Sequence, residues 1–296
     1  MSAAIVLPQT AAPALRLLDT LEPVSPWPGP GSEAAGEGTN GHVSASRLKC
    51  WQTCRRQYYY HYVRRIEVPV APALFLGTQV HDLLKRWNLA RWRGTPLDPE
   101  NLRAQFHQNW EQGQQDQPIA WKNEAEAAES RQQAWSLLER YFADCPIPAD
   151  EKPQGVEVRV ECDLSRHGLP PLLGYIDLVR GNGRIVELKT QARKTDPVQL
   201  AHQHQTQLAC YALAYRAATG RPETGFEIHS LIKTRDPQVQ VTVLDPLSPA
   251  QETELYRLLE AYLAGLEHEE WIKSPGQHCG WCDHFDRCRA SVPEDA

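Results

Sequence analysis

Carboxylate and lysine side chains gather in two short segments near the middle of the chain. Asp177 ends the segment Gly-Tyr-Ile-Asp, and Glu187 and Lys189 follow in the pattern Glu-x-Lys. A carboxylate from each of two neighbouring strands can hold a hard divalent cation such as Mg²⁺, which prefers oxygen ligands, water and substrate phosphate. Such a cation activates water, and a lysine beside it stabilises negative charge at phosphorus. The pattern therefore predicts metal-assisted hydrolysis of a phosphate ester.

The same residues also fit a structural role. Glu187 and Lys189 share one face of a strand, so they can form a simple ion pair on a half-exposed surface. A predicted hairpin favours the catalytic interpretation, because it brings Asp177 beside Glu187. In the helix that follows, Gln207 and Tyr211 lie one turn apart on one face. A polar stripe on a helix that packs against a sheet indicates that the helix borders a site.

Cysteines near the two ends of the chain form a second group with possible chemistry. Cys279, Cys282 and Cys288 have the spacing C-x2-C-x5-C, and Cys54 lies near the start. The C-x2-C hairpin is typical of tetrahedral metal sites, and zinc is the usual occupant of a small four-cysteine site. Three further side chains are alternative ligands: His278, His284 and Cys50, which lies one helical turn before Cys54. Cys145, Cys162 and Cys210 are interpreted as core or half-buried thiols.

Composition limits the class of protein. The 296 residues are 41% hydrophobic and 23% charged, which is ordinary for a soluble protein. No apolar run approaches the roughly 20 residues that cross a bilayer, and no basic segment followed by an apolar one marks a secretory signal. We therefore expect a cytoplasmic protein without membrane contact, whose eight cysteines are metal ligands or core residues and not disulfides.

The charge distribution supports nucleic-acid binding only at local basic patches. The net charge of −6 does not favour phosphate binding, but phosphate is bound by local basic patches. Arg55 and Arg56 lie beside a run of tyrosines, and Tyr59 in that run could stack on a base. We take these three residues as candidate DNA contacts, although core packing is an alternative role for the tyrosines. The chain has no helicase P-loop, so any unwinding would need a partner.

Hydrophobic periodicity predicts an α/β protein. Residues 1–40 are rich in Ala, Pro and Gly and are predicted to be a disordered tail. Helices are expected from Ser44 or Ser46 to Tyr62, over 77–91, 99–112, 123–143, 196–220 and 249–267. Strands are expected over 155–162, 172–180, 184–190, 225–234 and 238–244, and Asn182-Gly183 indicates a type I′ hairpin turn. We predict one domain over 41–296, with a helical insert at 92–150 and the cysteine motif at 268–290.

These motifs together resemble the RecB-like branch of the PD-(D/E)XK nuclease superfamily. The matching segments occur in the family's order: Gly77-Thr-Gln-Val-His81, Gly174-Tyr-Ile-Asp177, Glu187-Leu-Lys189 and Gln207-x3-Tyr211. The resemblance implies a restriction-endonuclease-like core of αβββαβ order with a mixed central sheet. It also implies metal binding by His81, Asp177 and Glu187, and catalytic roles for Lys189, Gln207 and Tyr211. Ile176 stands where many members have proline.

The cysteines strengthen one branch of this resemblance. Residues 46–60 are similar to the N-terminal motif of iron–sulfur members, which include the AddB-type nuclease domain and the CRISPR-associated adaptation exonucleases. The resemblance implies a [4Fe-4S] cluster held by Cys54, Cys279, Cys282 and Cys288. Arg55 departs from the proline that is usual at its position. Zinc stays open as the alternative occupant, as does Cys50 as the early ligand.

The resemblance implies a Mg²⁺- or Mn²⁺-dependent deoxyribonuclease. We expect an exonuclease that acts on single-stranded DNA or DNA ends in repair, recombination or CRISPR adaptation. The expected partners are DNA and either a helicase or CRISPR adaptation proteins. One alternative is a DNA-binding subunit of a helicase–nuclease complex, with a structural metal cluster and little activity of its own. Another is a zinc-containing protein that acts on RNA.

Overall fold

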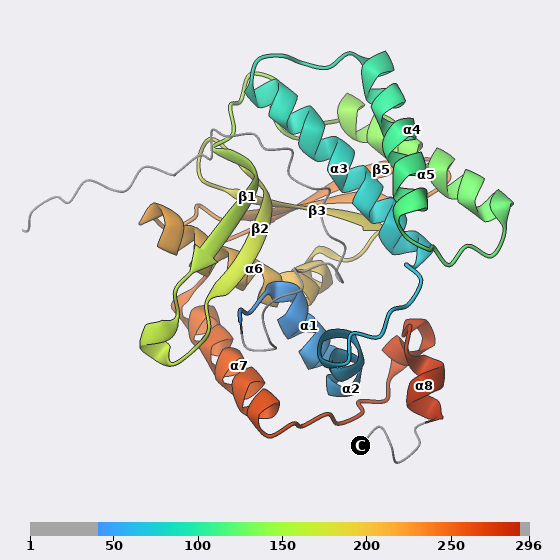
Figure 1. The fold of residues 1–296 in the computed structure, drawn as a ribbon. Coiled ribbons are helices and arrows are strands. Elements are labelled where there is room, and N and C mark those ends of the chain that lie inside the picture. The colour runs from blue at the N-terminus through green and yellow to red at the C-terminus, as the bar shows by residue number, and fades with distance from the viewer. Residues whose placement is uncertain (1–40, 291–296) are drawn as a thin grey trace, which may run out of the picture.

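A mixed five-stranded sheet forms the centre of the computed structural model, which describes residues 41–290 (Figure 1). The predicted disordered tail, residues 1–40, lies outside the described residues, as do residues 291–296. In space the strands follow the chain order: β1 Gly155–Cys162, β2 Leu172–Val179, β3 Ile185–Gln191, β4 Phe226–Ile232 and β5 Gln238–Leu244. Adjacent strands are antiparallel except β3 and β4, which are parallel. The predicted α/β fold class is confirmed.

Helix α6, Pro197–Thr219, makes the crossover that a parallel strand pair requires. Its ends carry the signals that the sequence predicts. Asp196 caps the first turn by accepting hydrogen bonds from the backbone N–H groups of Val198 and Gln199, and Pro197 occupies the first turn. Gly220 ends the helix in the left-handed conformation at φ +67°.

Helices cover both faces of the sheet (Figure 1). One hydrophobic core joins the sheet to α1 Ala45–Thr53, α6 and α7 Pro249–Glu267, and the other joins it to α3 Pro72–Trp92, α4 Pro99–Asp116 and α5 Glu124–Ala143. Strand β3 serves both cores, because Ile185 lies in the first and Val186 in the second. Because both faces of β3 are buried, consecutive residues of this strand are apolar.

The first predicted helix is divided in the structure. Helix α1 ends at Thr53, and Cys54 has an extended backbone with φ −162°. A short helix α2, Arg55–Tyr58, and a π-helical turn, Tyr59–Val63, complete the segment. At the other end of the chain, a 3₁₀ turn over Gln277–Trp281 precedes α8, Phe285–Arg289. Cys54 and Cys282 therefore have extended backbone, whereas Cys279 lies in the 3₁₀ turn and Cys288 in α8.

Two further predictions differ in detail. Helix α3 begins at Pro72 and not at Gly77, since a proline suits the first turn of a helix. The β2–β3 turn is not type I′, which needs positive φ at both central residues. Gly183 at φ +86° is the residue of this turn with positive φ, and its N–H donates to the carbonyl oxygen of Arg180 at 2.9 Å. Such geometry matches a type I turn followed by a left-handed glycine.

No helix within residues 41–290 combines the length and the apolar character that a membrane span requires.

Candidate active site

Strands β2 and β3 separate at Asp177 and Glu187. Their ladder contains only the pairs Leu178–Val186 and Val179–Ile185. One step further, Asp177 lies opposite Glu187, and Asp177 Oδ2 accepts a hydrogen bond from the backbone N–H of Leu188 at 2.7 Å. The carboxylate thus satisfies a strand N–H group that a continuous ladder would have paired. This bond also fixes the orientation of the Asp177 side chain.

Glu187 is the most enclosed charge of the site, with 2% of its surface exposed. Its Oε1 lies 2.5 Å from Lys189 Nζ and accepts a hydrogen bond from Gln207 Nε2 at 2.8 Å. The same Gln207 amide nitrogen lies 2.8 Å from the hydroxyl oxygen of Tyr211. The other carboxylate oxygen of Glu187, Oε2, is buried and has no hydrogen-bond partner among the described residues. A buried carboxylate oxygen without a partner is costly unless a ligand satisfies it.

His81 reaches the same site from helix α3, which covers the opposite face of the sheet from α6. Its Nδ1 lies 3.4 Å from Asp177 Oδ1. The site therefore combines side chains from two strands and from helices on both faces. All six residues predicted for metal binding and catalysis lie together: His81, Asp177, Glu187, Lys189, Gln207 and Tyr211.

Electrostatics link these groups. Burial raises the pKa of Glu187 and outweighs the opposing charge of Lys189. Burial would also raise the pKa of Asp177, but the charge and hydrogen bond of His81, with the Leu188 N–H, hold it below its usual range. Burial disfavours the charged form of Lys189, yet Glu187 outweighs that effect and raises the lysine pKa. His81 and Lys189 thus balance the negative charge of the two carboxylates.

The donor set suits a hard divalent cation, although it is not closed into a metal site. Within residues 41–290, no three His, Cys, Asp or Glu side chains converge in a way that could hold a metal ion as they stand. The carboxylates are instead engaged with His81 and Lys189. The unsatisfied Oε2 of Glu187 and the carboxylate–imidazole chemistry of the set fit Mg²⁺ or Mn²⁺.

Comparison with known protein families assigns the fold around these residues. The profile of the PD-(D/E)XK nuclease superfamily matches residues 42–289. The chain belongs to this superfamily. A search of curated proteins with the sequence of this superfamily member finds no match.

Solved structures resemble this PD-(D/E)XK protein at low sequence identity. A crystal structure from Eubacterium rectale, described as "Putative exonuclease", matches with a TM-score of 0.53 and 16% identity over 85% of this chain and 94% of that one. The structure of SSO0001 matches with a TM-score of 0.42 and 13% identity over 89% and 90% of the two chains. The first similarity supports the nuclease fold, and the second carries no argument.

Glu157 is a carboxylate of this PD-(D/E)XK site that the sequence analysis missed. It lies on β1 opposite Asp177, between the pairs Val156–Leu178 and Val158–Ile176. Its backbone is left-handed, with φ +49°, and the strand changes face there. Val156 accordingly packs in the core on the α3 side, and Val160 in the core on the α6 side.

The position of Glu157 has an electrostatic consequence. Burial, followed by the charge of Asp177, raises the pKa of its side chain to about 7. The alternation of valines in the sequence predicted a regular strand and gave no sign of this break. A strained backbone of this kind often marks a functional position.

The predicted cluster cysteines line one small cavity. Cys54, Cys279, Cys282 and Cys288 surround it together with His278 and His284. All of these cysteines are free thiols. Cys50 lies nearby but not on the lining, and burial, with Cys54 and Cys282, raises its thiol pKa to about 12. The structure therefore brings together the two cysteine segments that the sequence separates.

The three candidate DNA contacts, Arg55, Arg56 and Tyr59, lie beside this cavity and interact with other side chains of the protein. Arg55 forms an ion pair with Glu270, and its guanidinium lies 4.3 Å from the centre of the Trp51 ring. Arg56 lines the cavity, 5.6 Å from the Tyr59 ring centre. Tyr59 also packs at 5.3 Å from Trp271. These contacts give the three residues a packing role, whereas DNA contact stays a prediction.

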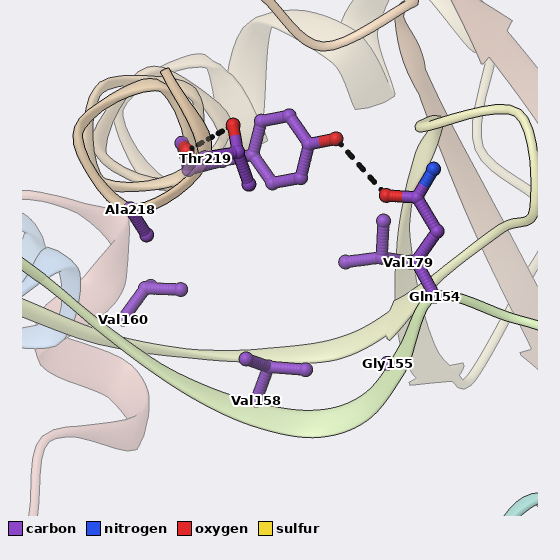
Figure 2. Close-up of a pocket in the computed structure, with 8 residues that line it drawn as sticks. Gln154, Gly155, Val158, Val160, Val179, Ala218 and Thr219 are labelled. Atoms are coloured by element: carbon purple, nitrogen blue, oxygen red, sulfur yellow. Dashed lines mark hydrogen bonds between the residues drawn. The ribbon is translucent and has the colours of Figure 1, made fainter. Parts of the chain in front are cut away.

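A second hollow lies between the C-terminal part of α6 and strands β1 and β2 (Figure 2). Val158, Val160 and Val179 line it, and the Tyr215 hydroxyl donates to Gln154 Oε1 at 3.2 Å across one side. None of the lining residues is charged. The hollow is therefore unsuited to phosphate chemistry, and the carboxylate site is the better candidate.

Proposed function

We propose that this protein is a metal-dependent deoxyribonuclease whose cation is held by His81, Asp177 and Glu187. The observation that carries the proposal is the arrangement of Asp177 and Glu187 across the point where β2 and β3 separate, with Lys189 on Glu187. A bound Mg²⁺ or Mn²⁺ would activate water and polarise the phosphodiester. Glu157, opposite Asp177, adds a further carboxylate on the same side of the site.

The other residues have separate roles in this proposal. Lys189 places a positive charge where negative charge develops on the phosphate. Gln207 donates to Glu187 and contacts Tyr211, so it holds the Glu187 carboxylate in one orientation. His81, beside Asp177, supplies an imidazole ligand and limits the rotation of that carboxylate. Gln207 and Tyr211 therefore act chiefly as positioning residues.

The substrate that we propose is single-stranded DNA or a DNA end, cleaved as an exonuclease. The motif order of the RecB-like branch and the similarity to the Eubacterium rectale protein described as "Putative exonuclease" support this choice. The processes in which such enzymes act are repair, recombination and CRISPR adaptation. A helicase or CRISPR adaptation proteins are then the proposed partners. The proposed unit is a single nuclease domain over 41–296, with its insert at 92–150 and its cysteine lobe at 268–290.

We further propose that Cys54, Cys279, Cys282 and Cys288 hold a [4Fe-4S] cluster. Four thiols from the two ends of the described chain line one cavity, which suits a group that needs four thiolate ligands. The cluster would join α2 to the terminal lobe, as in the AddB-type and CRISPR-associated members that the motif resembles. Zinc bound by the same thiols is the competing occupant.

An anaerobic preparation tests the proposals for cleavage and for the cluster together. Labelled single-stranded DNA, double-stranded DNA and RNA are incubated with the protein in Mg²⁺, Mn²⁺ or EDTA. We expect cleavage of single-stranded DNA from an end with either metal and none in EDTA, and iron and sulfide at about four each per chain. Binding without cleavage would favour the DNA-binding subunit, and stoichiometric zinc without iron would favour the zinc site.

A further inference from the structure

Helices α1 and α6 pack side by side next to Glu187 and Lys189. Both helices contribute to one hydrophobic core, and the Thr206 hydroxyl on α6 donates to Gln52 Oε1 on α1 at 3.2 Å. On α1, Lys49 lies one turn before Gln52. On α6, His204 lies one turn before Gln207, which itself donates to Glu187. Lys49 and His204 therefore face the junction between the two helices and the proposed active site.

Lys49 is an exposed lysine without an ion-pair partner among the described residues. The charges that act on it are those of the active site itself. Partial burial lowers its pKa first, the positive charge of Lys189 lowers it further, and Glu187 opposes both. Glu187 forms no ion pair with Lys49: its carboxylate is 2% exposed, Oε1 contacts Lys189 and Gln207, and Oε2 has no partner among the described residues. Lys49 thus adds a positive charge that forms no ion pair with a carboxylate of residues 41–290.

His204 is the buried polar residue of the same junction. It is 8% exposed, and its Nδ1 is buried with no hydrogen-bond partner in the described part of the chain. Burial, followed by the charges of Lys189 and Lys49, lowers its pKa to about 3. The imidazole is therefore neutral near pH 7, so it adds no charge but supplies a hydrogen-bonding group beside two lysines.

We propose that Lys49, with His204 in the same junction, binds a phosphodiester group of the substrate strand next to the phosphate that is cleaved. Lys189 is paired with Glu187, whereas Lys49 has no ion-pair partner among residues 41–290, so the junction carries a local positive charge although the chain as a whole is acidic at −6. A lysine ammonium on a flexible stem is suited to a phosphate oxygen. The inference rests on the proposed nuclease function and extends it, because it places the strand over the α1–α6 junction.

If the substrate strand lies over the α1–α6 junction, the cysteine lobe also affects DNA binding. Helix α1 ends at Thr53, immediately before Cys54, which lines the cysteine cavity. A cluster that holds Cys54 would also hold the end of the helix that carries Lys49. The DNA strand would then lie between the proposed metal site on the sheet and helix α1, whose end the cluster would hold.

The test compares Lys49→Met with Lys49→Arg and with Lys122→Met, a control at an exposed lysine in the α4–α5 loop. Binding of a short single strand is measured in Ca²⁺ over a range of salt. We expect Lys49→Met to bind about tenfold more weakly, with a salt slope reduced by about 0.7, the value for one phosphate of a single strand. Lys49→Arg should retain most of the affinity, and Lys122→Met should match wild type.

Strands with one neutral methylphosphonate then locate the phosphate. Neutralising the phosphate next to the cleaved one should weaken wild type and leave Lys49→Met unchanged. Wild-type affinity in Lys49→Met, or equal losses in both proteins at every position, would overturn the inference alone. A loss confined to a terminal phosphate would overturn the internal position and assign the site to DNA ends. If wild type neither binds nor cleaves nucleic acid, the proposed function fails, and this inference fails with it.

Discussion

The carboxylate site and the cysteine lobe are held in different ways. Asp177 and Glu187 lie in the middle of a sheet with a hydrophobic core on each face, and protein donors reach both side chains. The cysteine lobe has no buried hydrophobic side chain in its 3₁₀ turn or in α8. Backbone packing positions the first site, whereas the second needs a bound group to hold its ligands.

The contacts between the cysteine lobe and the N-terminal segment lie at the start of the lobe. Glu270 pairs with Arg55, Trp271 packs on Tyr59, and the Arg56 N–H donates to the carbonyl oxygen of Ile272 at 3.2 Å. His284, at 4% exposed, is its most enclosed side chain and packs 5.5 Å from the Tyr60 ring. The comparison predicts that ligand loss unfolds the lobe, while loss of the active-site charges leaves the fold intact.

The largest expected effect follows loss of a cluster ligand. Cys288→Ser or Cys54→Ser should abolish iron binding and lower the free energy of unfolding by on the order of 5 kcal/mol, because metal binding supplies folding energy in such a site. Iron content and anaerobic thermal unfolding measure both effects. Cys145→Ser, a half-buried thiol away from the cavity, is the control. Equal stability of Cys288→Ser and wild type would show that the lobe does not depend on a ligand.

The next effect is on catalysis without unfolding. Glu187→Gln should lower the cleavage rate by about 10³-fold, since it removes a proposed metal ligand and the partner of Lys189. Its melting temperature should stay close to that of wild type, because Lys189 loses its ion-pair partner but is 27% exposed and keeps the attraction of Asp177. Glu161→Gln, on the exposed side of β1, is the matched control. Cleavage at the wild-type rate by folded Glu187→Gln would remove the assignment of the active site.

Variants of Asp177 separate its proposed role in catalysis from its role as a hydrogen-bond acceptor in the fold. Both Asp177→Asn and Asp177→Ala should abolish cleavage. Only the alanine variant should lose stability, by about 1–3 kcal/mol, because the Leu188 N–H then loses the acceptor that it finds at 2.7 Å. Urea unfolding of the two variants in EDTA gives the difference. Identical stabilities would mean that the strands need no side-chain bond at this point.

The smallest effect is expected at Glu157. Glu157→Gln should weaken Mn²⁺ binding by about tenfold, or ~1.4 kcal/mol, as measured by titration calorimetry on anaerobic protein. Glu157→Gly should weaken it equally and stabilise the fold in EDTA by about 1 kcal/mol, because glycine adopts the φ of +49° without strain. Wild-type Mn²⁺ affinity in both variants would leave Glu157 a purely structural residue.

Local signals predicted most of the fold. Asp196, Pro197 and Gly220 mark the ends of α6 by rules that act within a few residues, and the structure confirms each of them. The break at Cys54 and the left-handed Glu157 were not predicted, because both serve contacts between distant segments. The hairpin turn was assigned to the wrong type, since the sequence Asn-Gly fits more than one register of a short loop.

Local sequence patterns predicted the order of the elements, indicated the superfamily and supplied six candidate residues for the carboxylate site, because the motifs are short and follow strand and helix periodicity. How these residues meet depends on contacts that form only in the folded chain. The tertiary structure separated β2 from β3 at Asp177, placed Glu157 opposite that residue and gathered thiols from both ends around one cavity. It also brought Lys49 of α1 within electrostatic reach of Lys189 on β3. Such contacts join residues far apart in the chain, and no local pattern encodes their distance.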